Sequence, residues 1–283
     1  MMSAGNCTST VPEKGVYGVD LGLRGKRALV TAASQGLGLA IATELTREGC
    51  EVVISSRRAE TLTEVARNMN AALGPETSSV RAVKADLVNE GDIRELVART
   101  AKLLGGIDIL VTNAGGPVGG NFDQVTDEDW QRAFDLNMMS VVRLIRETLP
   151  YMRRQGGGKI LNISSLYVRQ PNVNLILSNA IRTGTMALLK TLALQVAQEN
   201  IAVLNFAPGR INTDRVKWLD EQRASREGKA AFEVAKEEAA SIPMGRYGEP
   251  EEVGRLVTML LSSANSYMTG QTILADGGVI SAL

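Results

Sequence analysis

A glycine-rich segment near the start of the chain has the residue types and the spacing that bind a pyrophosphate. It reads Thr31-Ala32-Ala33-Ser34-Gln35-Gly36-Leu37-Gly38 and separates an apolar run from a stretch with helical periodicity. Glycines at such a turn let the backbone approach the phosphates, and the free N–H groups of the following helix attract their negative charge. The segment therefore predicts a dinucleotide site, with contacts from Thr31, Ser34, Gln35, Gly36, Leu37 and Gly38.

The end of the next apolar run bears on which dinucleotide is bound. It reads Ser55-Ser56-Arg57-Arg58 and lies where such a sheet meets the 2′ position of the adenosine ribose. An acidic residue there binds the 2′-hydroxyl of NAD, whereas a hydroxyl and an arginine suit the 2′-phosphate of NADP. Since no Asp or Glu stands at this strand end, Ser56 and Arg57 favour NADP(H) over NAD(H). Surface arginines without a ligand are the alternative.

Two further turns are expected at the same edge of the sheet. Asp86-Leu87 follows the third apolar run and is placed to meet the adenine, and Asn113-Ala114-Gly115 follows the fourth as another glycine-rich turn. The carboxyl ends of parallel strands lie at one edge, so these turns should face the same ligand as the first.

The composition excludes several classes of chemistry. The chain has no histidine, which removes histidine general bases, Ser-His-Asp triads and histidine-ligated metals, so we expect no metal. Acid–base work must then come from Tyr, Lys, Arg, Asp, Glu, Ser or a cofactor. The 31 basic and 31 acidic residues leave no net charge that would suit nucleic acid or an anionic membrane, so we expect a small-molecule substrate.

The sequence also bears on where the protein works. No hydrophobic run approaches the length of a membrane span, and the polar segment 1–20 lacks the pattern of a secretory signal. Two cysteines, Cys7 and Cys50, cannot make a disulfide framework. We therefore expect a protein of the reducing cytoplasm.

Alternating strand and helix patterns predict the scaffold that positions these residues, a doubly wound α/β sheet of the Rossmann type. Apolar runs rich in β-branched residues are typical of buried parallel strands. They lie at Arg27–Thr31, Glu51–Ser55, Val80–Lys84, Asp108–Thr112, Lys159–Ile163, Ile201–Phe206 and Gln271–Ala275. Amphipathic stretches lie between them, at Leu37–Glu48, Ala59–Ala72, Glu90–Leu104, Asp127–Arg154, Ser178–Glu199 and Glu251–Ser262. This repetition implies a seven-stranded parallel sheet with helices on both faces.

The chain is expected to form one domain, 23–283, after a flexible arm, 1–22. One segment, 213–246, breaks the strand–helix rhythm because it is highly charged and helix-prone. A long excursion on the ligand side of such a sheet is often a lid over the substrate. A pair of solvated surface helices is the alternative.

From Leu23 to Leu283 the chain resembles the short-chain dehydrogenase/reductase family, in its 3-oxoacyl carrier-protein reductase-like pattern. The motifs that carry the resemblance are Thr31–Gly38 (with Ala32 in place of the usual first glycine), Asp86-Leu87, Asn113-Ala114-Gly115, Asn137, Asn162-Ile163-Ser164-Ser165, Asn205 through Pro208-Gly209 to Thr213, and Asp276-Gly277-Gly278. The resemblance implies hydride transfer between a nicotinamide and a carbonyl or alcohol carbon, with Pro208, Gly209 and Thr213 holding the nicotinamide half. It also implies a homotetramer or homodimer, formed through Asp127–Arg154 and Ser178–Glu199.

The catalytic residues of this family have a fixed spacing, which the chain keeps only in part. Ser165 fits the serine that orients the substrate oxygen, and Asn137 fits the asparagine of a water relay. The family's tyrosine should follow Ser165 by thirteen residues and its lysine by four more, but these positions hold Ser178 and Arg182. Positions i and i+4 of a helix share one face, so the geometry is retained.

The chemistry of that pair is not retained, which leaves three hypotheses. A serine hydroxyl has a far higher pKa than a phenol, and a guanidinium stays protonated in proteins. In the first hypothesis the protein is a reductase in which Tyr167 replaces the acid, although Tyr167 could equally be an aromatic wall. In the second, a non-redox dehydratase, isomerase or cyclase uses the same scaffold. In the third, the protein senses NADP(H) without turnover. Arg169 and Arg210 flank the expected substrate site and suit either an anionic substrate group or solvent.

Overall fold

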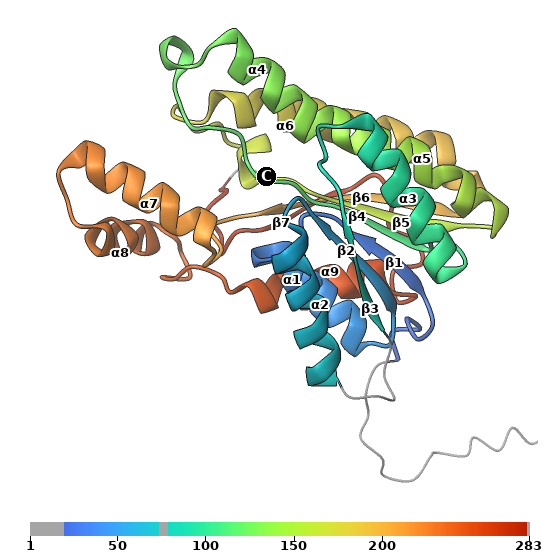
Figure 1. Cartoon of the computed structure of the whole chain (residues 1–283). Helices are drawn as coiled ribbons and strands as arrows, with labels where there is room; N and C mark the ends of the chain where they lie inside the picture. The colour runs from blue at the N-terminus through green and yellow to red at the C-terminus, as the bar shows by residue number, and fades with distance from the viewer. Residues whose placement is uncertain (1–19, 74–78, 282–283) are drawn as a thin grey trace, which may run out of the picture.

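The computed structural model describes residues 20–73 and 79–281, which form one parallel sheet between two layers of helices (Figure 1). The strand order is β3-β2-β1-β4-β5-β6-β7, and every neighbouring pair is parallel. The strands are β1 Arg27–Val30, β2 Glu51–Ser56, β3 Val80–Lys84, β4 Ile109–Thr112, β5 Gly158–Ile163, β6 Ile201–Pro208 and β7 Thr272–Ala275. The predicted doubly wound α/β fold with seven strands is therefore confirmed. Of the predicted arm, residues 1–19 lie outside the described residues.

Two apolar clusters hold helices against opposite faces of this sheet. The first buries side chains of α1, α2 and α9, among them Ile41, Met69 and Val257. The second buries side chains of α3, α5 and α6, among them Leu96 and Leu144. The helices are α1 Gly36–Arg47, α2 Ala59–Leu73, α3 Glu90–Leu104, α4 Asp127–Phe134, α5 Ser140–Arg154, α6 Ile176–Val196, α7 Asp214–Glu227, α8 Ala231–Ser241 and α9 Pro250–Leu261. Because both faces are covered, the central strands are apolar on both sides, as the sequence pattern indicated.

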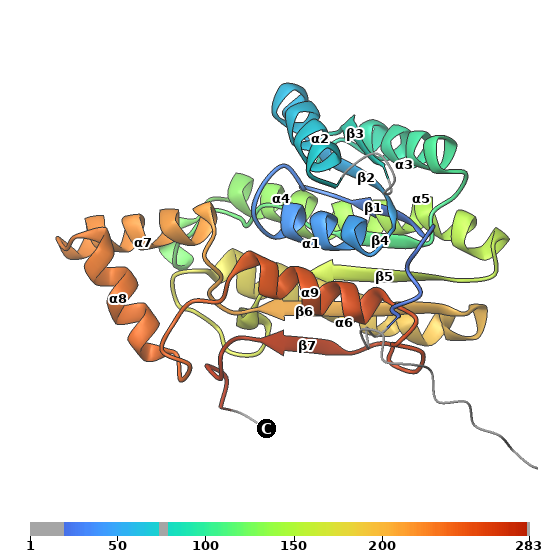
Figure 2. The ribbon, with the colours of Figure 1, turned by 90° about the horizontal axis from the view of Figure 1, so that it is seen from below.

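Successive strands are added to one side of β1 up to β3 and to the other side from β4 onward, and this change sets the position of the ligand crevice. The chain moves outward from β1 through β2 to β3, then returns to the other side of β1 for β4 and the later strands. In open sheets of this kind, ligands bind beyond the carboxyl ends of the strands at such a reversal. Figure 2 shows the arrows of β5, β6 and β7 pointing toward the side from which α7 and α8 project.

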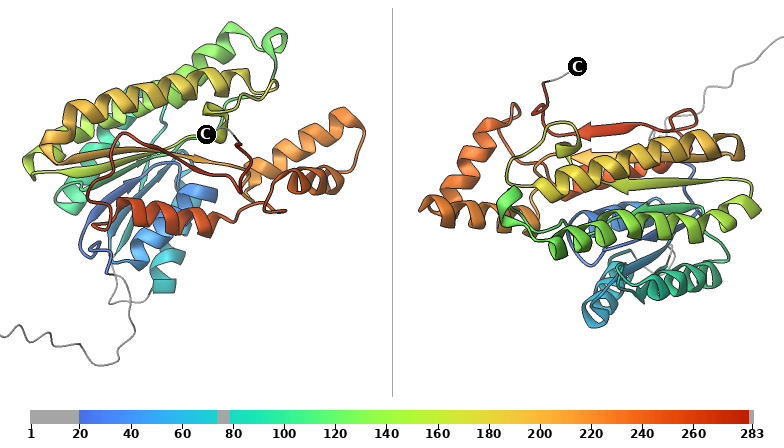
Figure 3. Two further views of the ribbon diagram at one scale, coloured as in Figure 1. Left: turned by 180° about the vertical axis from the view of Figure 1, so that it is seen from behind. Right: turned by 90° about the horizontal axis from the view of Figure 1, so that it is seen from above.

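The predicted stretch Asp127–Arg154 is not one regular helix. A π-helical turn, Asp135–Met139, separates α4 from α5. Such a turn inserts an extra residue into the helix and is frequent at functional sites. Here it turns the side chain of Asn137 into the protein, where it is 4% exposed. The views in Figure 3 show α5 and α6 lying side by side on one layer of the sheet.

The segment after β6 forms the helix pair α7 and α8, apart from the two helical layers (Figure 1). Within the described ranges, no helix combines the length and the apolar character that crossing a membrane requires.

Candidate active site

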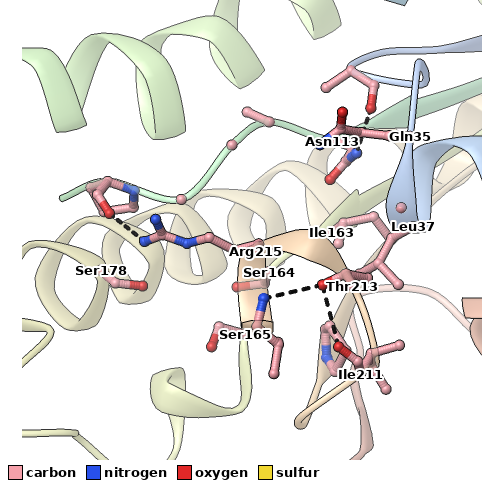
Figure 4. Close-up of a pocket in the computed structure, with 18 of the residues that line it drawn as sticks. Gln35, Leu37, Asn113, Ile163, Ser164, Ser165, Ser178, Ile211, Thr213 and Arg215 are labelled. Carbon is pink, nitrogen blue, oxygen red and sulfur yellow. Dashed lines mark hydrogen bonds between the residues drawn. The ribbon is translucent and has the colours of Figure 1, made fainter. Parts of the chain in front are cut away.

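A cavity of about 780 Å³ lies beyond the carboxyl ends of the strands, between the sheet and α7. It brings together most of the residues that the sequence predicted. They are Ser34, Gln35, Gly36, Leu37, Ser56, Arg57, Asp86, Leu87, Asn113, Ala114, Gly115, Ser165, Tyr167, Ser178, Arg182, Pro208, Gly209 and Thr213. Thr31, Gly38 and Asn137 do not line this cavity but lie directly behind its wall. Figure 4 shows part of the lining.

The glycine-rich turn after β1 presents an uncapped helix start to the cavity. Gln35 precedes α1 in an extended conformation, its side chain makes no capping hydrogen bond, and the first turn holds no acidic residue. Gly36 has a φ of +58°, which glycine tolerates without strain. The first backbone N–H groups of α1 are therefore available to an anion.

Two residues of this turn show how tightly it is packed. A Cβ atom at Gly38 would lie 2.5 Å from the carbonyl oxygen of Ala32 and 2.9 Å from Nδ2 of Asn113. Ala32 itself has a φ of +47°, a left-handed conformation that costs an alanine about 1–2 kcal/mol. The turn is thus held in shape by its neighbours, at the position where the family pattern has a glycine.

Hydrogen bonds between β1 and the loop after β4 provide that support. The Oγ1 hydroxyl of Thr31 donates to the carbonyl oxygen of Asn113 at 2.8 Å, and the Asn113 N–H donates to the same Oγ1 at 2.9 Å. Nδ2 of Asn113 donates to the carbonyl oxygen of Ala32 at 3.2 Å. Thr31 and Asn113 therefore position the two glycine-rich turns relative to each other.

The end of β2 gives the cavity a basic rim. Ser56, Arg57 and Arg58 line it, and no acidic residue stands at this strand end. Arg58 donates from Nη2 to Oε1 of Gln35 at 3.1 Å, which joins β2 to the turn before α1. The side chain of Arg57 has no ion-pair partner within the described ranges, so its charge is available to a ligand.

The opposite end of the cavity collects three hydroxyl groups. Ser165 follows β5, and its Oγ accepts a hydrogen bond of 3.3 Å from the N–H of Tyr167. Ser178 lies in the first turn of α6, is 7% exposed and also lines the cavity (Figure 4). Neither the Tyr167 phenol nor the Ser178 hydroxyl has a hydrogen-bond partner within the described residues, so both can bond a ligand.

Asn137 and Arg182 lie behind these hydroxyl groups. Nδ2 of Asn137 donates to the carbonyl oxygen of Gly115 at 2.9 Å, while its buried Oδ1 has no partner among the residues that the structure describes. Arg182 donates from Nη1 to the carbonyl oxygen of Ile163 at 3.0 Å. Burial, and then the charge of Arg215, lowers the pKa of the Arg182 guanidinium to about 10, so Arg182 is still cationic at neutral pH.

Comparison with known proteins identifies the family. A family model described as enoyl-(acyl carrier protein) reductase matches residues 31–280. The dehydrogenase/reductase SDR family member 4 of Sus scrofa is 37% identical over 264 residues, which cover 92% of this chain and 89% of that protein. This chain belongs to the short-chain dehydrogenase/reductase family. The resemblance that the motifs predicted is therefore confirmed.

Two further relatives show how general the match is. The 3-oxoacyl-(acyl-carrier-protein) reductase FabG of Thermotoga maritima is 32% identical over 262 residues, which cover 91% of this chain and 99% of that protein. The solved structure of L-sorbose reductase from Gluconobacter frateurii, in complex with NADPH and L-sorbose, is similar with a TM-score of 0.88 at 32% identity. That match covers 94% of this chain and 100% of the other. The likeness of this short-chain dehydrogenase/reductase to known reductases thus covers more than nine tenths of its chain.

Sequence reasoning did not single out Arg215, which also lines the cavity. Arg215, in the first turn of α7, donates from Nη2 to the carbonyl oxygen of Pro117 at 2.7 Å. Its guanidinium lies 4.5 Å from the ring centre of Trp218, and burial lowers its pKa. In the sequence, Arg215 is marked only by its position two residues after Thr213. The contact with Pro117, 98 positions away, depends on the fold.

The structure gives Arg210 a different role from either of the two predicted for it. Its guanidinium pairs with Asp220 at 2.6 Å and with Glu238 at 2.8 Å, and Tyr247 donates to Asp220 at 3.0 Å. Arg210 lines the cavity, but its guanidinium is paired with these carboxylates, and the pairs connect α7 and α8 to the end of β6. Arg169 is exposed and lies away from the cavity.

Proposed function

We propose that this protein is an NADP(H)-dependent reductase of carbonyl compounds with a proton donor other than the family's tyrosine. One observation carries the proposal: a single cavity joins the uncapped start of α1 to the hydroxyl groups of Ser165, Tyr167 and Ser178. A volume of about 780 Å³ lies within the usual range for a cofactor or ligand site.

The residues at the α1 end fit a phosphorylated dinucleotide. The N–H groups of α1 suit the pyrophosphate, and Ser56 and Arg57 suit a 2′-phosphate. NADPH in the related L-sorbose reductase supports the preference for NADP(H) over NAD(H). When bound, the reduced nicotinamide supplies the hydride that adds to the carbonyl carbon.

The chain's own hydroxyl groups position the carbonyl and complete the reduction. Ser165 orients the substrate oxygen, and Ser178 adds a second hydrogen bond to it. Tyr167 lines the same end of the cavity, and its phenol donates the proton that turns the oxygen into an alcohol. Ser178 is unsuited to that step because of the high pKa of a serine hydroxyl.

Arg182 and Asn137 act through charge and position. Arg182 holds the nicotinamide ribose, and its charge stabilises negative charge that develops on the substrate oxygen. It does not exchange protons, because its guanidinium stays protonated at neutral pH. Asn137 fixes the loop at Gly115 through Nδ2, and we assign its unpartnered Oδ1 to a water relay.

Three features of the wider protein belong to the same proposal. Helices α7 and α8, within segment 213–246, act as a lid over the substrate end of the cavity. A homotetramer or homodimer forms through α4–α5 and α6, where Phe134 is 36% and Leu194 74% exposed. The cytoplasmic location remains a prediction from the sequence.

The test is to measure cofactor binding and cofactor oxidation on one preparation. Purified protein is titrated with NADPH and with NADH by fluorescence. It is then given a panel of ketones and 3-oxoacyl thioesters, while the absorbance of the reduced nicotinamide is followed. We expect NADPH to bind more tightly than NADH and to be consumed with at least one carbonyl compound. Tight NADPH binding without consumption by any of the panel would overturn the reductase proposal.

A further inference from the structure

Two guanidinium groups face the catalytic end of the cavity without a carboxylate partner. Arg182 and Arg215 both line it, and within the described residues neither takes part in an ion pair. Each is at least half withdrawn from water, and burial lowers the pKa of both guanidinium groups, with a further contribution from the charge of Arg215 to the lowered pKa of Arg182. Buried charges in proteins are normally paired, so this arrangement calls for a negative partner.

The nearby acids do not supply that partner. Asp220 and Glu238 are already paired with Arg210, at 2.6 Å and 2.8 Å. Among the residues that line the cavity, the carboxylates are Asp86, at the β3 end, and Asp214, which is exposed. Neither lies within ion-pair distance of Arg182 or Arg215. Among the residues that line the cavity, Arg182 and Arg215 therefore have no carboxylate partner.

The surroundings of Arg215 fix its guanidinium in one place. Nη2 is bonded to the carbonyl oxygen of Pro117, and one face of the guanidinium lies over the ring of Trp218. A Cβ atom at Gly116 would lie 3.3 Å from Nη2, so the loop after β4 lies close against the guanidinium. Nη2 carries a second N–H, and neither this group nor Nε nor Nη1 makes a hydrogen bond within the described residues, so one edge of the guanidinium keeps two donors available.

We propose that the substrate carries a carboxylate and that Arg215 binds it, which makes the substrate class an oxo acid. Two donors on one planar guanidinium match the two oxygens of a carboxylate. Arg182 contributes the second positive charge at this end, while the phosphates of the cofactor lie at the other end, near α1 and Arg57. The inference rests on the proposed reductase function and adds the charge of the substrate to it.

The experiment compares oxo acids with their uncharged esters. Phenylpyruvate, acetoacetate and levulinate are each paired with their methyl ester. Their binding to the NADPH-saturated protein is measured by calorimetry, which requires no turnover. Oxidation of NADPH is followed separately. The variants are Arg215→Gln, which keeps an N–H donor for Pro117, and Arg215→Lys, which keeps the charge. Arg226→Gln, at an exposed arginine on the same helix, is the matched control.

We expect at least one acid to bind tenfold or more tightly than its ester. Arg215→Gln should weaken the binding of that acid by roughly tenfold to a hundredfold and leave the binding of the ester unchanged. Arg215→Lys should retain part of the preference, and Arg226→Gln all of it. Added salt should weaken the binding of the acid and not that of the ester.

Other outcomes separate this inference from the reductase proposal. If neutral ketones oxidise NADPH but no acid is preferred, the reductase proposal stands and the inference falls. If an acid binds through Arg215 but NADPH is never oxidised, the reductase proposal falls and so does the oxo acid as its substrate, while the carboxylate contact of Arg215 stands. An acid preference that survives Arg215→Gln, or no binding of any acid, also overturns the inference.

Discussion

Nη1 of Arg182 donates a hydrogen bond of 3.0 Å to the carbonyl oxygen of Ile163, the last residue of β5. This bond holds the Arg182 guanidinium beside Ser164 and Ser165, which follow β5. A lysine at this place would present a single flexible ammonium group, whereas the planar guanidinium keeps further donors directed at the cavity. Arg182 is thus oriented by the sheet before any ligand arrives.

Replacing Arg182 tests whether that orientation serves the cofactor. We expect Arg182→Met to weaken NADPH binding by about tenfold to a hundredfold, because a charged hydrogen bond to the ribose is lost. Arg182→Lys should lose less, since the charge remains. Fluorescence titration with NADPH measures both variants, and circular dichroism checks that they fold. Unchanged NADPH affinity in the Met variant would show that Arg182 does not contact the cofactor.

Tyr167 is the proposed proton donor, and removal of its hydroxyl group tests that role. We expect Tyr167→Phe to lower kcat by about a hundredfold or more, the usual contribution of a general acid, while NADPH affinity stays the same. Tyr151→Phe, at the opposite end of the sheet, should leave kcat unchanged. A Tyr167→Phe enzyme with full kcat would make Tyr167 an aromatic wall of the cavity.

Arg57 is expected to select NADP(H). Arg57→Ala should weaken NADPH binding by roughly tenfold to a hundredfold and leave NADH binding nearly unchanged, because only NADPH carries the 2′-phosphate. Arg67→Ala, at an exposed arginine of α2, is the control. Parallel titrations with the two cofactors measure the ratio. Equal losses for NADPH and NADH would place the contact of Arg57 elsewhere on the dinucleotide.

The ion pair between Arg27 and Asp108 should make stability depend on pH in the acid range. Nε of Arg27 lies 2.7 Å from Oδ2 of Asp108, and both side chains are mostly buried. Burial raises the pKa of Asp108, but the hydrogen bonds and charge of Arg27 outweigh it and hold that pKa below the ordinary value of 3.8. The stabilisation is therefore present above that value and is lost as the pH falls below it.

Urea unfolding of Asp108→Asn and of the unchanged protein, at pH 7 and at pH 3, measures this effect. We expect the variant to be less stable by about 1–3 kcal/mol at pH 7, because the partly buried guanidinium loses its partner. The difference should shrink at pH 3. A gap that stays constant between the two pH values would mean that the carboxylate charge contributes nothing.

The sequence was sufficient for the fold because the strands carry their own signal. Runs such as that of β4 are apolar on both faces and bounded by turn residues, so the predicted and observed strands differ by no more than two residues at either end. The break at Asp135–Met139 could not be predicted. A π turn adds one residue to a helical repeat without changing the residue types, so the pattern of Asp127–Arg154 looks continuous.

The site was predictable where one loop supplies the residues and not where distant loops meet. Gly36 and Gly38 act through local backbone geometry, which can be recognised from neighbouring residues in the sequence. Arg215 and Arg210 act through partners on other elements, Pro117 for the first and Glu238 for the second. Both lie near a charged segment, and charge alone does not tell a cavity residue from an anchor or a surface residue.

The reversal of strand order between β1 and β4 has a consequence for how such enzymes diversify. The cavity residues around Arg57 come from residues 32–87, and those around the hydroxyl groups of Ser165 and Ser178 come from residues 113–219. The loop 105–108 separates the two stretches along the chain. A chimera joined to a relative at this loop would therefore take the basic rim of the cavity from one parent and its hydroxyl groups from the other.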